Sequence, residues 1–424
     1  MVQSLKKMWK IEDLRKKLLY TFGMLILFRL VGVIPAPGVD IAKVMSQSNA
    51  ETLPLLELVN MMTGNAFSQM TIMAMGITPY INASIIMQLL TIAIPALERM
   101  QRDENGGREK IQRISRYVTV ALAAIQAIGL VAGLGYVKAG WLNYVLVGVS
   151  MAGGTALAMW IGERITDKGI GNGISLLIFA GIISNLFNGI ISLFSTAITT
   201  GTTSAWIAAF SIIVVAILMT VIVTFVDLGE RRIPLQIAKQ VKGRRVYGGQ
   251  NTHMTLKVIA VGVLPLIFAY SFLSFPGTIG QLVAPHSGFT AWCNTHLVNG
   301  AWVHLILSAI LIFAFTFFYS SISFDAKKQA EQLQQQGATI PGRRGKDIAS
   351  FLQRTTNRLN LFAAIFLAVL AAIPTLMLSG LNLQVPYAAS SMLIAVSVSL
   401  ETMRTIKGEM AIRGIQSDKD NGFM

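Results

Sequence analysis

Residues 76–90 read GITPYINASIIMQLL and combine a chain break with a regular stripe. The stretch is apolar enough to lie in a membrane, yet it opens on a glycine and contains a proline three residues later. Ile77, Ile81 and Ile85 recur at a spacing of four, which places all three on one face of an α-helix. The stretch therefore predicts a membrane helix that begins directly after a break and carries an isoleucine stripe.

The rest of the chain contains further apolar runs of similar length. Its 424 residues are 53% hydrophobic and only 13% charged. The hydrocarbon core of a bilayer requires about 17–25 apolar residues of each helix that crosses it. We therefore predict an all-α membrane protein with ten spans, at residues 18–36, 70–94, 114–137, 141–162, 170–192, 205–227, 256–275, 301–324, 359–379 and 386–403.

The predicted spans divide evenly around the loop near residues 195–205. Because five is an odd number, the second set of five spans runs inverted relative to the first, as in many membrane transport proteins. We predict an N-terminal half at 1–194, a C-terminal half at 195–404 and a cytoplasmic tail at 405–424.

Lysine and arginine lie mainly on one side of the predicted membrane. Of the 35 Lys and Arg, 32 fall on alternate loops or near the termini, and the net charge is +15. The positive-inside rule then makes both termini cytoplasmic in a multi-pass membrane protein. The basic N-terminal stretch lacks a small-residue cleavage site, so we do not expect a cleaved signal peptide.

Two cytoplasmic loops, 228–257 and 325–358, carry seven Lys and Arg each and are longer than topology requires. The pairs Arg231–Arg232 and Arg244–Arg245 are predicted to be exposed tips of protruding loops. Such tips suit a ribosomal RNA surface or an acidic partner protein. Topology and attraction to anionic lipid are the simpler alternative explanation of the charge.

The span interiors contain almost no ionisable side chains, although ion-coupled transporters usually need them. Arg29 is expected to snorkel outward, and Asp227 to lie at a cytoplasmic span end. The neutral side chains of Asn82, Gln88 and Gln126 are expected to join neighbouring helices. A carrier of charged solutes is therefore disfavoured.

Enzyme chemistry finds no support in the sequence. It contains no paired carboxylates and no HExxH, GxSxG or P-loop motif, and its single cysteine and four histidines lack metal-site spacing. We therefore predict no enzyme activity, no cofactor and no metal. A secondary transporter of a small neutral solute, built from inverted repeats, is the alternative function. An interaction scaffold without transport has no feature in its favour.

A second isoleucine pair supports a pore. Ile174 and Ile178 repeat the spacing of four at the end of GIGNGISLL (169–177), whose glycines are predicted to start a helix. A ring of branched aliphatic side chains seals a constriction against water and ions without binding anything. The alternative is that these isoleucines face lipid or neighbouring helices. Residues 52–69 are too apolar for a solvated loop, which predicts a short re-entrant helix that plugs the pore.

Several long motifs together resemble the SecY family of protein-conducting channels. The resemblance covers about residues 10–405 and rests on RLVGVIPAPGVD (29–40), GITPYINASIIMQLL (76–90), GGREKIQRISRY (106–117), GERITDKGIGNGISLLIFAGI (162–182), ERRIPLQIAKQVKGRRVYGGQ (230–250) and the GATIPG that ends residues 325–342. It implies a channel subunit of the inner (cytoplasmic) membrane that conducts unfolded secretory precursors across this membrane and releases apolar segments sideways into lipid.

The resemblance also assigns residues to the parts of such a channel. It implies a pore ring of Ile77, Ile81, Ile85, Ile174, Ile178, Ile267 and Ile394. It implies a plug at 53–67 that includes Leu55, Leu56, Val59, Met61, Met62 and Thr63. The second and third spans against the seventh and eighth would form a lateral gate, with Asn82 and Gln126 as polar latches.

Partners are implied in the same way. Arg231, Arg232, Arg244, Arg245 and Arg344 match loop arginines that engage the SecA ATPase or the ribosome in this family, and SecE and SecG are the implied accessory subunits. Signal sequences, secretory precursors and membrane lipid complete the set. Three departures from the family pattern are PYAASSMLIA in the tenth span, PGRRGKD (341–347), which leaves Arg343 and Arg344 as alternatives, and NMMTGNAFS in the plug.

Overall fold

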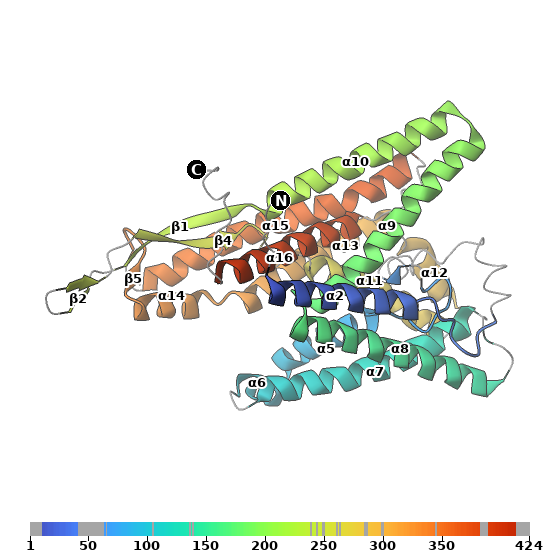
Figure 1. Ribbon diagram of the computed structural model, residues 1–424, viewed down its shortest axis with the longest axis horizontal. Coiled ribbons are helices and arrows are strands. Elements are labelled where there is room, and N and C mark those ends of the chain that lie inside the picture. The colour runs from blue at the N-terminus through green and yellow to red at the C-terminus, as the bar shows by residue number, and fades with distance from the viewer. Residues whose placement is uncertain are drawn as a thin grey trace.

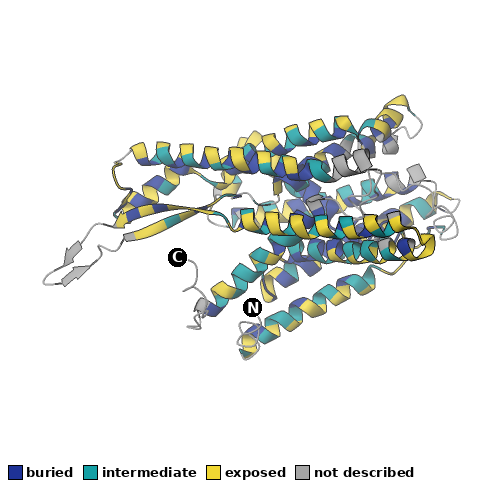
Figure 2. Ribbon diagram, turned by 90° about the horizontal axis from the view of Figure 1, so that it is seen from above, coloured by how far each residue is buried: buried dark blue, intermediate teal, exposed yellow. Residues whose placement is uncertain are grey.

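The computed structural model describes residues 11–40, 63–64, 66–103, 106–134, 137, 140–237, 240–242, 245–247, 251–259, 262, 264–283, 287–297, 301–343, 346–381 and 389–412. Long helices lie roughly side by side and form the body of the molecule, and a β-hairpin extends beyond them at one end (Figure 1). Large apolar side chains remain exposed along many of these helices (Figure 2), as expected for surfaces that face lipid.

Each of the ten predicted spans contains a helix. In the N-terminal half these are α2 (Glu12–Val31), α5 (Thr78–Ala93) with its continuation α6 (Pro95–Arg102), α7 (Gly107–Leu134), α8 (Trp141–Lys168) and α9 (Gly173–Thr200). In the C-terminal half they are α10 (Thr203–Asp227), α11 (Leu264–Val283), α13 (Trp302–Ser323), α15 (Lys346–Leu381) and α16 (Ala389–Ile412), with the short helices α12 (Gly288–His296) and α14 (Ala326–Gln335) between them.

Length and composition alone qualify some of these helices as membrane spans. Within the described residues, five helical runs are long and apolar enough to cross a membrane. They are those of α8, α9, α10, α13 and α15, and the bent pair α5–α6 makes a sixth if it is counted as one span. The crossing of the membrane by α2, α7, α11 and α16 stays a prediction from the sequence. The inverted relation between the halves, with its boundaries at 194 and 404, likewise stays a prediction.

The second span begins later than predicted. A helix was expected from residue 70, but residues 66–77 form consecutive turns and α5 starts at Thr78. Positive φ angles at Met70 (47°) and Gly76 (50°) are incompatible with a continuous helix, so the prediction is wrong there. Hydrogen bonds to the chain after α2 satisfy part of this buried backbone, with Ala36 N donating to Met70 O and Ile72 N to Ile34 O.

The other end of α5 is a sharp bend. The helix axes of α5 and α6 differ by 106°, and the break lies at Ile94, which is extended (φ −108°, ψ 110°). Proline disfavours helical geometry in the residue before it, and Pro95 follows Ile94 directly. The helix that carries the isoleucine stripe is therefore bounded by a glycine turn and a proline bend.

The predicted helix start in GIGNGISLL is confirmed. Asn172 caps α9, because its side-chain Oδ1 accepts hydrogen bonds from the backbone N–H groups of Ile174 and Ser175. Gly173 lies against α8, where an added Cβ would stand 2.0 Å from the carbonyl oxygen of Gly162. The glycines thus allow α8 and α9 to pack at backbone contact.

The all-α prediction missed a small sheet. Strand β1 (Glu230–Ile237) pairs antiparallel with β4 (Asn251–Lys257), and β5 (Ala338–Thr339) adds to the other edge of β1. Two short strands, β2 (Gln240–Lys242) and β3 (Arg245–Tyr247), form a second pair further out. The fold class is unchanged, since the sheet is confined to the two long basic loops, with β1 and β4 from the first and β5 from the second.

The two basic loops, which the sequence presented as separate, pack together. Ile233 and Leu235 alternate along β1 and are 2% and 6% exposed. They share an apolar cluster with Leu333 of α14 and with Ile348 and Leu352 of α15. We call β1, β4, β5, α14 and the first turns of α15 the basic-end unit.

The N-terminal and C-terminal sets of helices meet along two interfaces. In one, α5 and α7 pack against α11. In the other, α9 packs against α10 and α16, and α2 contacts α16 through the Lys17–Glu409 ion pair. We refer to these as the α7–α11 interface and the α9–α16 interface. The largest apolar cluster among the described residues contains side chains from both sets of helices.

Candidate functional site

The structure brings all seven predicted ring isoleucines into one apolar cluster. Ile77, Ile81, Ile85, Ile178 and Ile394 belong to its buried core, and Ile174 and Ile267 pack against it from partly exposed positions. They come from the start of α5 and from α9, α11 and α16, so both sets of helices contribute. The pore function of this cluster stays a proposal, since packing alone does not distinguish a constriction from a core.

The two isoleucines of α9 differ in their surroundings. Ile178 is 5% exposed within the cluster. Ile174 lies over α8, where a Cβ added to Gly162 would stand 2.9 Å from Ile174 Cγ1. Of the two, Ile178 is therefore the better placed for a central ring.

The described end of the predicted plug contacts the break that precedes α5. Thr63 is buried, and a Cβ added to Gly76 would stand 2.6 Å from Thr63 Cγ2. A glycine is therefore required at residue 76 for two reasons: the backbone has a positive φ there, and Thr63 leaves no room for a Cβ. The other predicted plug residues, Leu55, Leu56, Val59, Met61 and Met62, lie outside the described residues.

Arg29 also contacts this segment. Its guanidinium is half-buried, and Nη1 donates a hydrogen bond to the carbonyl oxygen of Gly64 at 3.1 Å. The sequence suggested a side chain that snorkels outward, but the structure bonds it to Gly64. Arg29 therefore holds the described end of the predicted plug against the end of α2.

The side-chain oxygens of the two predicted gate latches are buried. Oδ1 of Asn82 (α5) and Oε1 of Gln126 (α7) have no hydrogen-bond partner within the described part of the chain, and the same holds for Thr78 Oγ1. An unpaired buried polar atom costs about 1–3 kcal/mol. The helices on the N-terminal side of the α7–α11 interface thus carry polar atoms that the packing of the described residues leaves unsatisfied.

A hydrogen bond that sequence reasoning missed joins the two sides of this interface. The Tyr319 hydroxyl of α13 donates to Oε1 of Gln88 in α5. The sequence marked Gln88 as a neutral polar residue in a span but gave it no partner. The two residues are 231 positions apart, so no local spacing could have paired them.

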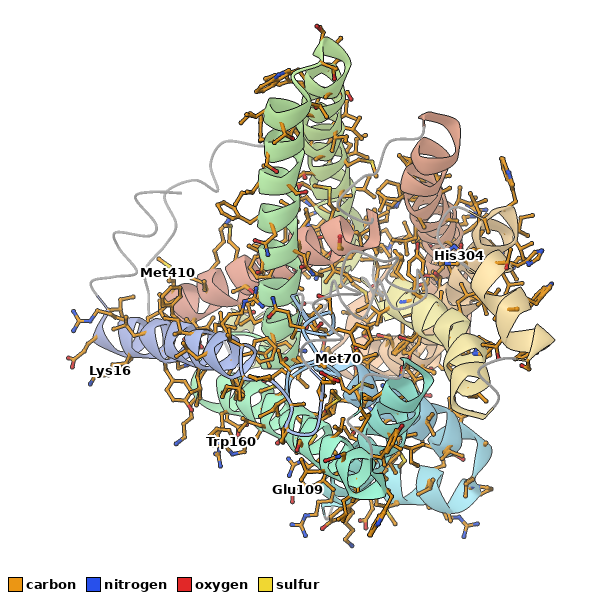
Figure 3. The ribbon with its side chains drawn as sticks, turned by 90° about the vertical axis from the view of Figure 1, so that its right-hand side faces the viewer. Lys16, Met70, Glu109, Trp160, His304 and Met410 are labelled. Atoms are coloured by element: carbon orange, nitrogen blue, oxygen red, sulfur yellow. The ribbon has the colours of Figure 1, made fainter. Side chains whose placement is uncertain are left out.

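One ion pair joins the two sets of helices at the α9–α16 interface, where Lys17 of α2 pairs with Glu409 of α16 at 2.7 Å. A second ionic contact supports α16 from within the C-terminal set. Arg404 of α16 donates from Nη2 to the backbone oxygen of Asp227 at the end of α10 at 3.1 Å and lies 3.9 Å from its carboxylate. Leu14 and Met410 belong to a small apolar cluster beside the Lys17–Glu409 pair, and Figure 3 shows Met410 next to the start of α2.

The predicted arginine tips are placed differently from expectation. Arg231 and Arg232 are exposed, but they lie in β1 near the end of α10 and not at a tip, so that part of the prediction is wrong. Arg245 lies in β3, and Arg244 and Arg344 fall outside the described residues. Arg343, the alternative to Arg344, places its guanidinium 4.2 Å from the ring centroid of Phe351.

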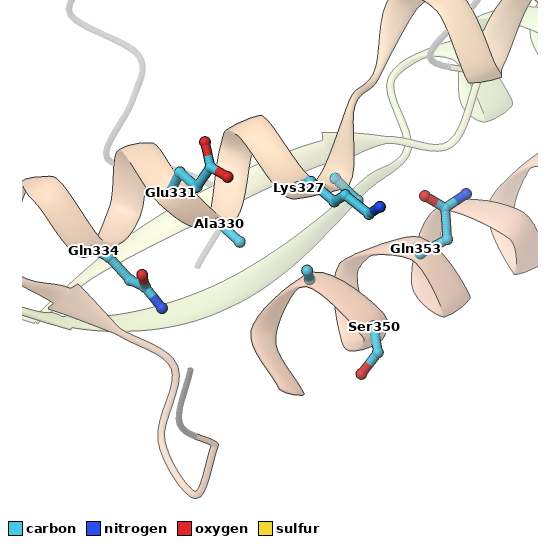
Figure 4. A pocket seen from close by; sticks show the side chains of 8 residues that line it. Lys327, Ala330, Glu331, Gln334, Ser350 and Gln353 are labelled. Carbon is cyan, nitrogen blue, oxygen red and sulfur yellow. The ribbon is translucent and has the colours of Figure 1, made fainter. Parts of the chain in front are cut away.

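An open groove runs along the basic-end unit between α14 and α15 (Figure 4). Lys327, Glu331 and Gln334 line it from α14, and Ser350 and Gln353 from α15, with alanines at its floor. Asp325 caps α14 by accepting from the backbone N–H groups of Lys327 and Lys328. The groove has a mixed polar and apolar lining. Helix α14, which forms one of its walls, lies at the same end of the molecule as the hairpin (Figure 1).

The described residues contain no group of three or more His, Cys, Asp and Glu that could hold a metal ion. Cys293 of α12 is a free, buried thiol, and burial raises its pKa. The chemistry of the site is therefore that of packing and hydrogen bonding between helices, at least in the part of the chain that the structure describes.

Comparison with known proteins decides the family. The SecY family model matches residues 71–403. The chain belongs to the SecY family. The protein translocase subunit SecY of Streptomyces scabiei is 38% identical and covers 98% of this chain and 99% of its own length. The sequence left two functions open, a protein-conducting channel and a transporter of small solutes. Membership of the SecY family supports the channel and gives no support to the transporter.

Two solved structures show the same fold at lower identity. A protein-conducting channel superposes with a TM-score of 0.71 at 22% identity, and the match covers 93% of this chain and 92% of that one. The channel Sec61 from a canine ribosome–channel complex of the endoplasmic reticulum gives 0.67 at 20% identity, with coverage of 93% and 92%. The chain is therefore an all-α, multi-pass membrane protein with the channel fold.

Proposed function

We propose that this chain is the channel subunit of a Sec protein translocase. It conducts unfolded secretory polypeptides across the cytoplasmic membrane and releases transmembrane segments into lipid. The observation that carries the proposal is that one apolar cluster contains all seven predicted ring isoleucines, from the start of α5 and from α9, α11 and α16. Family membership independently supports it.

A constriction of this kind suits a chain that must pass without being bound. Isoleucine side chains offer no hydrogen bonds, so a translocating polypeptide meets no site that would retain it, while water and ions are excluded. Residues 53–67 act as the plug in this proposal. Support comes from Thr63, packed on Gly76, and from Gly64, bonded to Arg29.

Lateral release takes place at the α7–α11 interface, between α5 and α7 on one side and α11 and α13 on the other. Unsatisfied polar atoms at Asn82 and Gln126 weaken the closed packing. A signal sequence that binds the open form better than the closed form shifts the equilibrium toward opening. The α9–α16 interface serves as the hinge.

The basic-end unit is the proposed docking surface for partners on the cytoplasmic side, where both termini lie. Its exposed arginines, including Arg231 and Arg232, together with Arg244, Arg245 and Arg344, engage the SecA ATPase or ribosomal RNA. The related Sec61 occurs in a ribosome–channel complex, which supports ribosome binding here. SecE and SecG are the proposed accessory subunits.

A photo-crosslinkable residue at Ile178 tests the proposal. With a secretory precursor arrested midway, we expect a crosslink to the mature part of the precursor that depends on SecA. A probe at Phe187, on the same helix but 64% exposed, is the matched control and should not react. If the preparation exports the precursor while Ile178 crosslinks only to neighbouring helices, the isoleucine ring is misplaced; without export, the translocase function itself fails.

A further inference from the structure

The hydrogen bond between Tyr319 and Gln88 is the feature that the proposed function leaves unused. It joins α13 to α5, two helices that must separate if the α7–α11 interface opens. Its two residues come from different halves of the chain. The bond therefore exists in the closed arrangement and has to break when a segment passes between these helices.

Tyr319 is held in place by its aromatic neighbours. Its ring stacks on Phe268 of α11, with centroids 4.5 Å apart and an interplanar angle of 16°, and Phe318 meets it edge-on at 5.7 Å. The residue is only 7% exposed and belongs to the same apolar cluster as the ring isoleucines. Because the ring is fixed by α11, the hydroxyl has little freedom to follow Gln88 when α5 moves.

Gln88 is the more exposed residue of the pair. It lies on α5, before the bend at Ile94, and its backbone oxygen accepts a hydrogen bond from the Thr91 hydroxyl at 2.7 Å. Its side chain is exposed, so it faces the region into which a released segment would move. The Tyr319–Gln88 pair thus lies at the exposed edge of the α7–α11 interface.

We infer that the Tyr319–Gln88 hydrogen bond is a latch that sets how apolar a segment must be to leave the channel sideways. The inference rests on the proposed function. An apolar segment that enters between α5 and α13 separates a phenol from an amide and offers neither of them a partner. The lost hydrogen bond raises the free energy by the same amount for every segment. Only a segment whose apolar surface makes its transfer into lipid favourable enough can offset this amount.

The substitution Tyr319→Phe removes the donor and keeps the stacked ring. A typical hydrogen bond of this kind implies a rise of about 2- to 10-fold in the ratio of open to closed channels. We use a series of test segments with increasing leucine content and define the half-release point as the number of leucines at which half of the segments leave the channel into lipid. In the variant this number should fall by about two leucines. Gln88→Leu removes the acceptor and should produce the same shift. The double variant should shift no further than either single one, because both remove the same bond.

Ser320→Ala is the matched control. Ser320 is the next residue of α13, and its Oγ accepts a hydrogen bond from Asn360 Nδ2 of α15, within the C-terminal set of helices. The variant therefore loses a buried hydrogen bond on the same helix without touching the interface. It should lower stability and leave the half-release point where it is.

The experiment uses the full chain with its partner subunits in proteoliposomes and measures the fraction of each test segment that becomes integrated into lipid. A shift in Tyr319→Phe and Gln88→Leu, absent in Ser320→Ala, supports the latch. The latch is overturned if neither variant shifts the half-release point, if Ser320→Ala shifts it equally, or if the two shifts add in full. If the unmodified channel neither exports a precursor nor integrates any segment, the proposed function falls instead.

Discussion

The two interfaces between the halves of this protein are built from different chemistry. At the α9–α16 interface, one ion pair, Lys17–Glu409, joins the halves, and the Arg404–Asp227 contact holds α16 to α10 on the C-terminal side. At the α7–α11 interface, the helices contribute buried oxygens that have no partner among the described residues, and the neutral hydrogen bond from Tyr319 to Gln88 joins the halves. The contrast supports the proposal that one interface persists and the other opens.

The chain connection reinforces this contrast. Helices α9 and α10 follow each other directly through a turn in which Gly201 adopts φ +62°. The halves are therefore tied covalently at the α9–α16 side. At the α7–α11 side no such short connection joins α5 or α7 to α11, because α8, α9, α10 and the β-hairpin intervene along the chain.

The largest predicted effect concerns the packing of α9, a helix of the α9–α16 interface, on α8. Gly173→Ala places a Cβ 2.0 Å from Gly162 O and 2.7 Å from Ile165 Cβ, so the backbone of α8 or α9 must move. Overpacking of this kind should cost about 3 kcal/mol or more. Thermal unfolding in detergent measures it. Gly153→Ala in α8, where a Cβ meets nothing within 4 Å, is the control and should be neutral or slightly stabilising.

Arg404→Gln tests the ionic contact that holds α16 to α10 on the C-terminal side of the α9–α16 interface. The variant leaves the buried carboxylate of Asp227 without its cation, which should lower the unfolding free energy by about 1–3 kcal/mol. The half-release point for test segments should not change. Lys407→Gln removes the same charge from an exposed position on α16 and should have no measurable effect on stability. A changed release point in Arg404→Gln would contradict the assignment of this interface as a hinge.

Asn82→Leu should act in the opposite direction to the loss of the latch. Asn82 Oδ1 is buried and has no partner among the described residues, so replacing the amide with an apolar side chain of similar size should stabilise the closed packing by about 1–2 kcal/mol. More leucines should then be needed for release, in the same segment series. Gln126→Leu should change the half-release point in the same sense. Easier release in both variants would show that these amides stabilise the closed form.

The smallest effect is expected from Glu409→Gln. The Lys17 and Glu409 side chains are 36% and 24% exposed, so solvent screens their attraction. The loss of unfolding free energy should be below about 1 kcal/mol and should shrink further in high salt. A loss as large as that of Arg404→Gln would mean that exposed contacts contribute more to this interface than its geometry suggests.

The sequence predicted those parts of the fold and site that depend on local pattern. The stripe of Ile77, Ile81 and Ile85 and the start of α9 at Asn172 follow from spacing and capping within a few residues. The β-hairpin escaped because only Ile233 and Leu235 alternate clearly in β1. A strand of that length in a basic loop does not stand out beside ten apolar helices.

The contacts that define the two interfaces could not be predicted from spacing. Tyr319 and Gln88 are 231 positions apart, and Lys17 and Glu409 are 392 apart. The packing of Thr63 on Gly76 depends on a positive φ that the glycine permits but does not require. Long-range pairs of this kind are set by helix packing and appear only in three dimensions.

One crosslinking measurement tests most directly whether the two interfaces differ in function. In a Cys293→Ala background, the pair Gln88→Cys and Tyr319→Cys is joined by a short bis-maleimide, and the pair Lys17→Cys and Glu409→Cys is joined in the same way in a second channel. We predict that the first crosslink abolishes integration of a strongly apolar segment and that the second leaves it intact. Integration that survives the first crosslink, or that is lost equally with the second, would contradict the assignment of one interface as gate and the other as hinge.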